Sequence, residues 1–489
     1  MGKTRTASQR PNLLLICADQ LAQRAVGAYG DPWARTPHID SLARSGVRFA
    51  NSYTPCPLCL PARAAYWTGR TPHQTGVTSN GRLLEIPPIP DDWPTLGSLF
   101  AEAGYECVHF GKTHDAEALR GFRVEPWGAI KDESLPAHLG ANNDTFQDIH
   151  TTRACVEYLN GRPTTPFLMV ADLHNPHNIC GYVGANRGPH EDQPIPGPLP
   201  ELPDNFEDAD LAKRPLPVQY ICCTHNRLAQ AANWSPENYR HYLAAYYFYL
   251  ELVDRQIGEI LVALEASGQR DNTLIVFYAD HGDGMASHRM ATKQVSFYEE
   301  VTRVPLVFCG PGIDGADRLI ERPLVSLLDL LPTLCDVAGV RTPHGLWGRS
   351  LRPWLAGRQE ASPHAFVASE WHSEWGFTIS PGRMIRSPQY KYTRYLEGDG
   401  EELYDLVADP GETRNLTDDP AHIAALAQHR AWLNQYVHDT DDPFFSLAVK
   451  VDPRWRSHPL GYPNHRGLAA PEWTDKHGGD PKPAGQSQP

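Results

Sequence analysis

Short apolar segments rich in β-branched and aromatic residues alternate with segments of helical periodicity along most of the chain. This pattern predicts buried strands, which we place at Asn12–Cys17, Cys107–Phe110, Pro166–Ala171, Thr273–Tyr278 and Val304–Phe308. Strands that alternate with helices are typical of an α/β fold, in which helices cover both faces of one large sheet.

One long helix is predicted over Asn238–Ala266. Leu243, Leu250 and Ile257 recur there at helical spacing, and Gly268 is a stop signal just after the last periodic residue. We interpret these apolar positions as core and assign them no function.

The pattern changes to shorter elements after about residue 360. Short strands with tight turns are predicted at Ala365–Ser369, Arg383–Arg386, Lys391–Tyr395 and Glu402–Asp405, followed by a helix near 420–437. We therefore predict a main domain over 10–362 and a smaller C-terminal α+β subdomain over 363–450, in which a short antiparallel sheet packs with the helix. The Gly- and Pro-rich remainder, 451–489, is expected to be an extended, partly disordered tail.

One segment inside the main domain breaks the alternation. Residues 178–238 are rich in proline and poor in periodicity, which is typical of a lid or a binding insertion in a compact domain.

Composition narrows the class of protein. The chain has 489 residues, 41% of them hydrophobic, and a formal net charge of −14, which suits a soluble globular protein and argues against a nucleic-acid binder. A local cluster of cations can still bind a small anion. The apolar run Leu13–Cys17 is too short for a membrane span or a signal peptide. We expect no membrane span and a cytoplasmic protein, or a periplasmic or secreted one if a leader precedes this start.

Candidate chemistry follows two of the predicted strands. Asp19 comes directly after the first strand, and Asp280 and His281 come directly after the fourth. Ligands of open α/β sheets gather beyond the carboxyl ends of the strands. Two carboxylates and an imidazole at that edge would suit a divalent cation.

A cysteine lies between these two sites in the sequence Cys59-Leu60-Pro61-Ala62-Arg63, which continues to Thr68-Gly69-Arg70. Pro61 fits the first turn of a helix and the alanines continue it. Cys59 would then lie at a helix N-terminus, where the helix dipole favours anions.

These motifs together resemble the sulfatases of the alkaline-phosphatase superfamily, over roughly residues 10–420. Besides the segments named above, the resemblance rests on Thr36-Pro37-His38-Ile39-Asp40, Gly111-Lys112-Thr113-His114, Asn175-Pro176-His177, Asp280-His281-Gly282 with Lys293, and Glu402-Leu403-Tyr404-Asp405-Leu406 with Asp409-Pro410, Glu412 and Asn415-Leu416. It implies an alkaline-phosphatase-like large mixed sheet flanked by helices, with 10–362 as the catalytic domain.

The resemblance also implies the reactive group. Cys59 would be oxidised by a formylglycine-generating or sulfatase-maturating enzyme to formylglycine (3-oxoalanine), whose hydrate attacks the sulfur of a sulfate ester and expels the alcohol. The implied metal ligands are Asp19, residue 59, Asp280 and His281, with Gln20 beside them. One divalent cation is expected, Ca²⁺ first and Mn²⁺ or Mg²⁺ as alternatives.

The remaining implied roles belong to polar residues around the sulfate. Arg63 would hold residue 59, while Lys112 and Lys293 would bind sulfate oxygens. His177 or Lys293 would protonate the leaving alcohol. His114 would take the proton that lets the sulfated intermediate collapse. Asn80 is a further substrate-binding candidate, with a turn residue before Gly81 as the alternative interpretation.

One departure from the family pattern opens an alternative. Many sulfatases have Asp-Asp where this chain has Asp19-Gln20, and Asp-Gln is also found in the related phosphonate monoester hydrolases and in choline sulfatases. The alternative is therefore a phosphonate monoester or phosphodiester hydrolase of the same superfamily. Lys112 and His114 favour the sulfatase, because those hydrolases resemble a Tyr and Thr pattern there. A non-catalytic ligand-binding homologue with unmodified Cys59 is a third reading.

The substrate is expected to be a small anionic sulfate ester of a sulfated carbohydrate. The proline-rich segment 178–238 (with Cys222-Cys223-Thr224-His225-Asn226) and Glu370-Trp371-His372 are predicted to shape the leaving-group pocket, since cations and ring faces suit such a sugar. The oligomeric state is left open.

Overall fold

An eight-stranded mixed sheet forms the centre of the larger part of the molecule. In spatial order its strands are β5 (Arg123–Pro126), β4 (Glu106–Gly111), β6 (Phe167–Leu173), β1 (Asn12–Ala18), β7 (Thr273–Tyr278), β8 (Leu306–Cys309), β2 (Val47–Phe49) and β9 (Arg318–Ile320). Neighbouring strands are parallel except at β8, which is antiparallel to both β7 and β2. The predicted fold class, a large mixed sheet flanked by helices, is confirmed.

The computed structural model describes most of the chain from residue 10 to residue 447. The described ranges are 10–80, 86–126, 145–185, 198–207, 214–215, 217–218, 231, 234–293, 296–358, 361–372, 381–396 and 400–447. The predicted tail 451–489 and Cys222–Asn226 lie outside them. The predicted lid is only partly described, and it begins with helix α6 (Ile179–Ala185).

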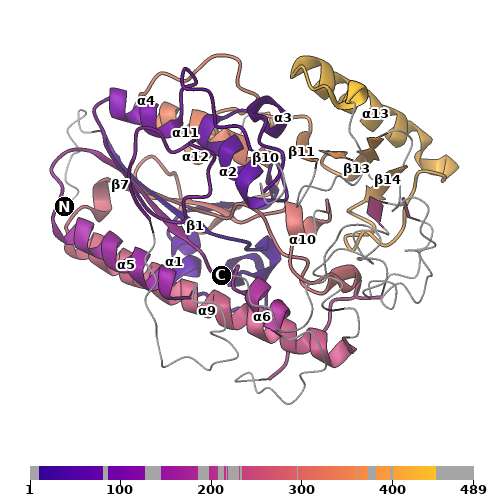
Figure 1. Ribbon diagram of the computed structural model, residues 1–489, viewed down its shortest axis with the longest axis horizontal. Coiled ribbons are helices and arrows are strands. Elements are labelled where there is room, and N and C mark those ends of the chain that lie inside the picture. Colours follow the sequence, from indigo (N-terminus) through magenta and orange to yellow (C-terminus); the bar gives the residue numbers. More distant parts are fainter. Residues whose placement is uncertain are drawn as a thin grey trace.

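Helices cover both faces of the sheet (Figure 1). Below the sheet in this view lie α1 (Pro37–Arg44), α5 (Thr145–Asn160), α6 and α9 (Pro236–Ala266), and above it lie α2 (Cys59–Thr68), α3 (Pro72–Thr75), α4 (Leu96–Glu102), α11 (Leu330–Ala338) and α12 (Arg352–Leu355). Among the described residues, no helix combines the length and apolar character needed to cross a membrane. The central strands β1, β6 and β7 are buried along their whole length, because helices exclude water from both faces.

The register of the central strands decides which side chains meet beyond their carboxyl ends. Cys17 of β1 pairs with Asp172 of β6 and with Tyr278 of β7. Asp19 and Asp280 each lie two residues beyond those paired positions. The two aspartates therefore leave adjacent parallel strands at the same level.

A smaller antiparallel sheet follows the large one. Its strands run in chain order as β11 (Val367–Trp371), β12 (Gly382–Arg386), β13 (Tyr390–Tyr395) and β14 (Glu401–Asp405), and helix α13 (Ile423–Asp439) packs on them. A separate hydrophobic core that includes Ile385, Leu403 and Leu433 lies between the sheet and α13. Figure 1 shows this unit beside the large sheet, next to α10 (Glu299–Thr302) and α3.

The main strands lie where the hydrophobic pattern places them, within one or two residues at either end. The pattern misses β2, β5, β9 and the two-stranded pair of β3 (Ser52–Tyr53) with β10 (Val325–Ser326). Each of these has only two to four residues, which are too few for an alternation to be recognised.

Candidate active site

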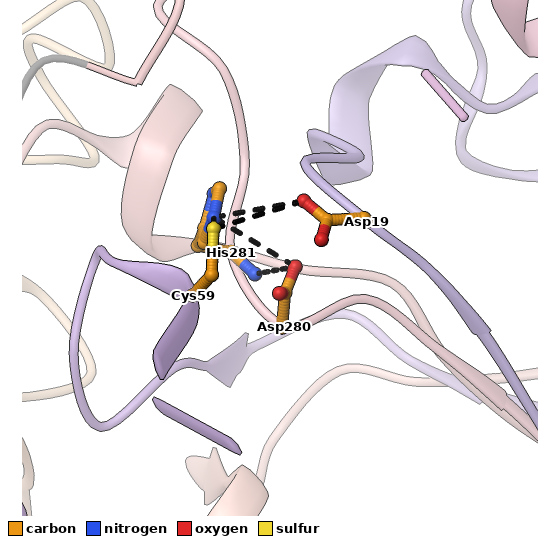
Figure 2. A group of neighbouring side chains, drawn as sticks. All are labelled: Asp19, Cys59, Asp280 and His281. Atoms are coloured by element: carbon orange, nitrogen blue, oxygen red, sulfur yellow. Dashed lines mark hydrogen bonds and ion pairs between the residues drawn. The ribbon is translucent and has the colours of Figure 1, made fainter. Parts of the chain in front are cut away.

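Three acidic or imidazole side chains converge beyond β1 and β7. Asp19 follows β1, and Asp280 and His281 follow β7; all three are fully buried. Figure 2 shows them turned toward one another and toward Cys59. The structure thus brings together the residues that the strand-end rule selected from the sequence.

Cys59 is the first residue of α2 and is buried, with 1% of its surface exposed. The side chain of Leu58 cannot cap this helix; instead Asn80 Oδ1 accepts a hydrogen bond from the Leu60 backbone N–H at 3.0 Å. The preceding loop is tied to β7, since Thr54 Oγ1 donates to the Asp280 carbonyl at 2.6 Å. The helix N-terminus is therefore anchored against the strand end that carries Asp280.

The four side chains form one compact group in which the ligand atoms all lie within 4.8 Å of one another. Cys59 Sγ lies 3.0 Å from His281 Nε2 and 3.9 Å from Asp19 Oδ1. His281 Nε2 lies 3.8 Å from Asp280 Oδ1. These atoms surround a common point (Figure 2).

Hydrogen bonds around this group fix which atoms face its centre. His281 Nδ1 lies 2.9 Å from the Gly282 carbonyl, and a carbonyl can only accept, so Nδ1 carries a proton. In the neutral ring, Nε2 then presents its lone pair. A second partner that orients the ring is usual for metal-binding histidines. Two carboxylate oxygens and this nitrogen fit a hard divalent cation such as Ca²⁺, Mg²⁺ or Mn²⁺, so the residues suit the metal that the resemblance implies.

Arg63 lies under the group and binds three carboxylates at once. Its Nε donates to Asp280 Oδ2 at 2.9 Å, Nη2 to Asp19 Oδ2 at 3.2 Å and Nη1 to Asp172 Oδ2 at 2.5 Å. The guanidinium is 1% exposed. These hydrogen bonds hold the two aspartates that face Cys59, and the expected contact of Arg63 with residue 59 stays a prediction.

Asp172 is a functional candidate that sequence reasoning missed. It lies near the carboxyl end of β6, is fully buried, and its Oδ2 also lies 3.4 Å from His109 Nε2 on β4. Burial raises the pKa of Asp172, but Arg63 and His109 outweigh it and leave the pKa below its usual value. The sequence does contain a signal for this residue, because Asp172 is a carboxylate inside an otherwise apolar strand.

Lys112 follows β4 and donates from Nζ to Asp19 Oδ2. Burial disfavours its charge, but the Asp19 carboxylate and Cys59 raise the pKa of Lys112 above its usual value. The cations act on Cys59 in return. Burial would raise the pKa of the Cys59 thiol, yet Lys112, Lys293 and His281 hold it well below its usual range. The site therefore favours a negative charge at residue 59.

The two predicted catalytic histidines also lie at the group. His114 is half-buried and hydrogen bonds to the Cys59 side chain. His177 follows the cis Asn175–Pro176 bond. Burial, Lys293 and Lys112 lower the pKa of His177 well below its usual range, although Asp19 opposes them. His114 and His177 are thus placed near the reactive group, as the sequence analysis expected.

Lys293 and Gln20 are hydrogen-bonded to each other. Lys293 Nζ donates to Gln20 Oε1 at 3.0 Å, and Gln20 Nε2 donates to Asp283 Oδ2 at 2.7 Å. The side-chain oxygen of Gln20 is thus engaged with an ammonium group. That Gln20 also binds the metal stays a prediction, and so does substrate binding by Asn80, whose side-chain oxygen caps α2.

Part of the predicted leaving-group region forms a second polar group beside the site. Glu370 of β11 accepts hydrogen bonds from His73 and Tyr436, and its backbone N–H donates to the Pro55 carbonyl at 2.9 Å. Burial and Arg383 lower the pKa of the neighbouring His372 to about 3. Glu370 therefore supports the loop that leads to Cys59.

The charges of the site are nearly balanced without a metal. The buried groups linked by these contacts are the carboxylates Asp19, Asp172, Asp280 and Asp283 and the cations Arg63, Lys112 and Lys293. With residue 59 uncharged, as formylglycine would be, there is one more carboxylate than cation among these groups, so a bound divalent cation would leave them with one positive charge. Such a site favours a singly charged sulfate ester.

The fold and this site define a hydrolase of anionic esters of the alkaline-phosphatase type. The family profile described as Sulfatase matches residues 11–340, and the profile described as N-sulphoglucosamine sulphohydrolase, C-terminal, matches residues 287–439. The chain belongs to the sulfatase family and is a hydrolase of sulfate esters.

Individual relatives agree with the family. A Delta 4,5-hexuronate-2-O-sulfatase of Bacteroides thetaiotaomicron is 51% identical over 96% of this chain and 98% of its own length. A solved structure of a 2-O GAG sulfatase, also 51% identical, matches 93% of this chain and 98% of its own with a TM-score of 0.88. The phosphonate monoester hydrolase of Agrobacterium radiobacter is 23% identical over 88% of this chain and 96% of its own, with a TM-score of 0.69, and shares the fold alone.

Proposed function

We propose that the chain removes the 2-O-sulfate of a hexuronate, with the Δ4,5-unsaturated hexuronate as its preferred substrate class. The observation that carries this proposal is the 51% identity, over nearly the whole of both chains, to a Delta 4,5-hexuronate-2-O-sulfatase. The match covers 96% of this chain, so it includes the segments that carry the candidate site residues.

The contacts of the site are consistent with sulfate ester hydrolysis. Cys59 lies where a divalent cation, Lys112, Lys293 and the N-terminus of α2 would all favour negative charge. When bound, the cation would neutralise sulfate oxygens and acidify the hydrate of formylglycine 59. Lys112 and Lys293 would bind sulfate oxygens. His114, which hydrogen bonds to residue 59, is placed to take a proton from it.

Maturation of Cys59 is the second part of the proposal. The thiol is 1% exposed, so a formylglycine-generating enzyme would have to reach it before the fold closes. We expect active enzyme only after co-expression with such a partner.

The test uses the full chain, co-expressed with a formylglycine-generating enzyme and loaded with Ca²⁺. The substrates are a Δ4,5-unsaturated uronate disaccharide sulfated at the uronate O2, its saturated analogue, a disaccharide sulfated only on the other sugar, an aryl sulfate and a phosphonate monoester. We expect the highest kcat/KM on the first substrate. Preference for the sugar sulfated elsewhere would refute the proposed position, and preference for the phosphonate would favour the alternative hydrolase.

A matched variant tests the nucleophile. Cys59→Ala should abolish turnover of every sulfate ester, because no hydrate can form at residue 59. The peptide that contains residue 59 should show the formylglycine mass in the wild-type protein and an unaltered alanine in the variant. Near-normal rates from Cys59→Ala would contradict the assignment.

A further inference from the structure

The segment that carries Lys293 has an unusual backbone. Several non-glycine residues adopt left-handed conformations with positive φ: Met285 (45°), Ala286 (64°), His288 (49°), Arg289 (56°) and Thr292 (63°). Such conformations are costly for L-residues and persist where surrounding contacts enforce them. The position of Lys293 therefore depends on groups that hold this segment.

Helix α9 supplies those groups from the adjacent face of the sheet (Figure 1). Tyr239, Tyr242 and Tyr246 recur at helical spacing along one face of α9 and are buried. Tyr239 donates to the Arg289 carbonyl at 2.7 Å, and the Tyr242 hydroxyl accepts from the Thr292 N–H at 2.8 Å. Tyr246 donates to the Gln20 carbonyl at 2.7 Å. Three hydroxyls of one helix thus hold both the Lys293 segment and Gln20.

A hydrogen-bonded chain connects the same helix to the ammonium group itself. The Tyr242 hydroxyl donates to Asp283 Oδ1, Gln20 Nε2 donates to Asp283 Oδ2 at 2.7 Å, and Lys293 Nζ donates to Gln20 Oε1 at 3.0 Å. A carboxylate can only accept and an ammonium can only donate, so the amide of Gln20 can face them in one orientation only.

This arrangement explains the amide at position 20. An aspartate or glutamate there would face the Asp283 carboxylate as a like charge, without a donor to offer it. Glutamine satisfies Asp283 with its N–H and Lys293 with its oxygen at the same time. The departure from Asp-Asp is therefore matched by a partner on the other side of the site.

We propose that Asp283 and Tyr242 are positioning residues for Lys293, acting through the side-chain amide of Gln20. The proposal rests on the proposed function for the sulfate-binding role of Lys293. It adds that this role requires the buried chain of hydrogen bonds from Tyr242 through Asp283 and Gln20, which fixes the ammonium group before substrate arrives. Preorganisation of this kind is valuable because a small displacement of a positioned group lowers catalysis strongly.

The experiment is a double-mutant cycle on the matured, metal-loaded enzyme. Tyr242→Phe and Asp283→Asn are each made in the wild type and in Lys293→Met. In the wild type we expect each to lower kcat/KM by about 10- to 100-fold. In Lys293→Met, where the ammonium is absent, we expect each to change the remaining rate by less than about 2-fold. Tyr247→Phe is the control, because Tyr247 also lies on α9 and donates to a carboxylate, Asp31, at 2.7 Å.

A second readout does not need turnover. Binding of inorganic sulfate, measured by calorimetry, should weaken about 3- to 10-fold in Tyr242→Phe and Asp283→Asn, and neither change should matter in Lys293→Met. If the two variants weaken sulfate binding as expected but the wild type does not hydrolyse 2-O-sulfated hexuronates, the proposed substrate is wrong and the positioning role of Tyr242 and Asp283 is still supported. Equal losses in both backgrounds, or loss of bound metal in the Asp283 variant, would show that Asp283 serves the metal or the fold and would overturn the proposal.

Discussion

Arg63 shows how closely the buried charges around Cys59 depend on one another. Its guanidinium binds Asp19, Asp172 and Asp280, and all four side chains are 0% or 1% exposed. Two of these carboxylates face the proposed metal, whereas Asp172 is set behind them with His109. Arg63 therefore ties the two ligand carboxylates to each other, and its third donor group engages Asp172.

At Asp172 we predict a loss of both stability and activity. Asp172→Asn replaces a carboxylate that faces Arg63 and His109 with an uncharged and weaker acceptor, so the free energy of unfolding should fall by about 2 kcal/mol. kcat/KM should fall at least 10-fold, because Asp19 and Asp280 lose their common support. Denaturant unfolding and steady-state kinetics measure the two effects.

The control for Asp172 is an exposed pair on the same chain. Asp336 lies 2.8 Å from Arg352, and their side chains are 37% and 53% exposed. Asp336→Asn should change stability by less than about 1 kcal/mol. Equal effects of the two substitutions would show that burial of Asp172 is not what matters.

At the scale of elements, the N-terminus of α2 depends on a residue that is distant in the sequence. Asn80 Oδ1 accepts from the Leu60 N–H at 3.0 Å and so takes the place of a local cap. The same helix end carries the reactive residue. Its position therefore depends on a segment twenty residues further along the chain.

Asn80 variants can separate capping from substrate binding. Asn80→Ala should lower the free energy of unfolding by about 1 kcal/mol, whereas Asn80→Asp keeps an acceptor and should stay close to the wild type. Thermal unfolding measures both. If the two variants instead raise KM with unchanged stability, Asn80 acts on the substrate, as the sequence analysis predicted.

The contact between α3 and the smaller sheet is sensitive to pH. His73 lies 2.8 Å from Glu370 Oε1 and 3.0 Å from the Thr440 carbonyl, and Asp442 and Arg383 complete the group. Burial opposes protonation, but Glu370 and Asp442 raise the pKa of His73 above its usual value. In the protonated ring both nitrogens donate, which fits both acceptors.

The sign of the pH effect follows from this direction. The folded-state pKa of His73 exceeds its unfolded value of about 6.5, so the stabilisation is complete below that pH and is lost as pH rises through the folded pKa. His73→Gln should therefore lower the free energy of unfolding by about 1–2 kcal/mol at pH 6. At pH 9 the same substitution should cost less. Urea unfolding at both pH values measures this. His438→Gln, at an exposed His–Asp pair, is the control; a pH-independent cost of His73→Gln would contradict the prediction.

At the scale of the whole molecule, two cores meet at the site. The large core surrounds the eight-stranded sheet, and the smaller one lies between β11–β14 and α13. The loop that leads to Cys59 touches both, through Thr54 to Asp280 and through Pro55 to Glu370. Docking of the two units thus contributes to the geometry of residue 59.

Metal removal should affect the whole fold because the buried group carries an excess of carboxylate. Chelation should abolish turnover and lower the Tm. Restoring Ca²⁺ at about 100 times its Kd should stabilise the protein by about 2.7 kcal/mol. Calorimetric scans with Ca²⁺, Mn²⁺ and Mg²⁺ measure the shift and rank the ions. An unchanged Tm with all three would contradict a metal bound by Asp19, Asp280 and His281.

The sequence by itself determined the α/β class, the main strands, the smaller C-terminal unit and which residues are candidates for the site. The periodicity of hydrophobic residues indicates which positions are buried. Asp19, Cys59 and Asp280 lie at the ends of elements, where that periodicity stops. The Cys59–Arg63 motif and its companions added the family, because the chemistry of a sulfate ester requires those residue types together.

Only the tertiary structure decided how these residues contact one another. That Arg63 holds carboxylates, that Asp172 and His109 stand behind it, and that Tyr242 and Asp283 reach Lys293 through Gln20 all depend on strand register and on α9 packing against the sheet. Local sequence cannot encode such contacts, because the partners lie from tens to hundreds of residues apart and meet only when the sheet closes. The physical reason is that burial makes each of these polar groups require a partner, and the fold alone settles which one is within reach.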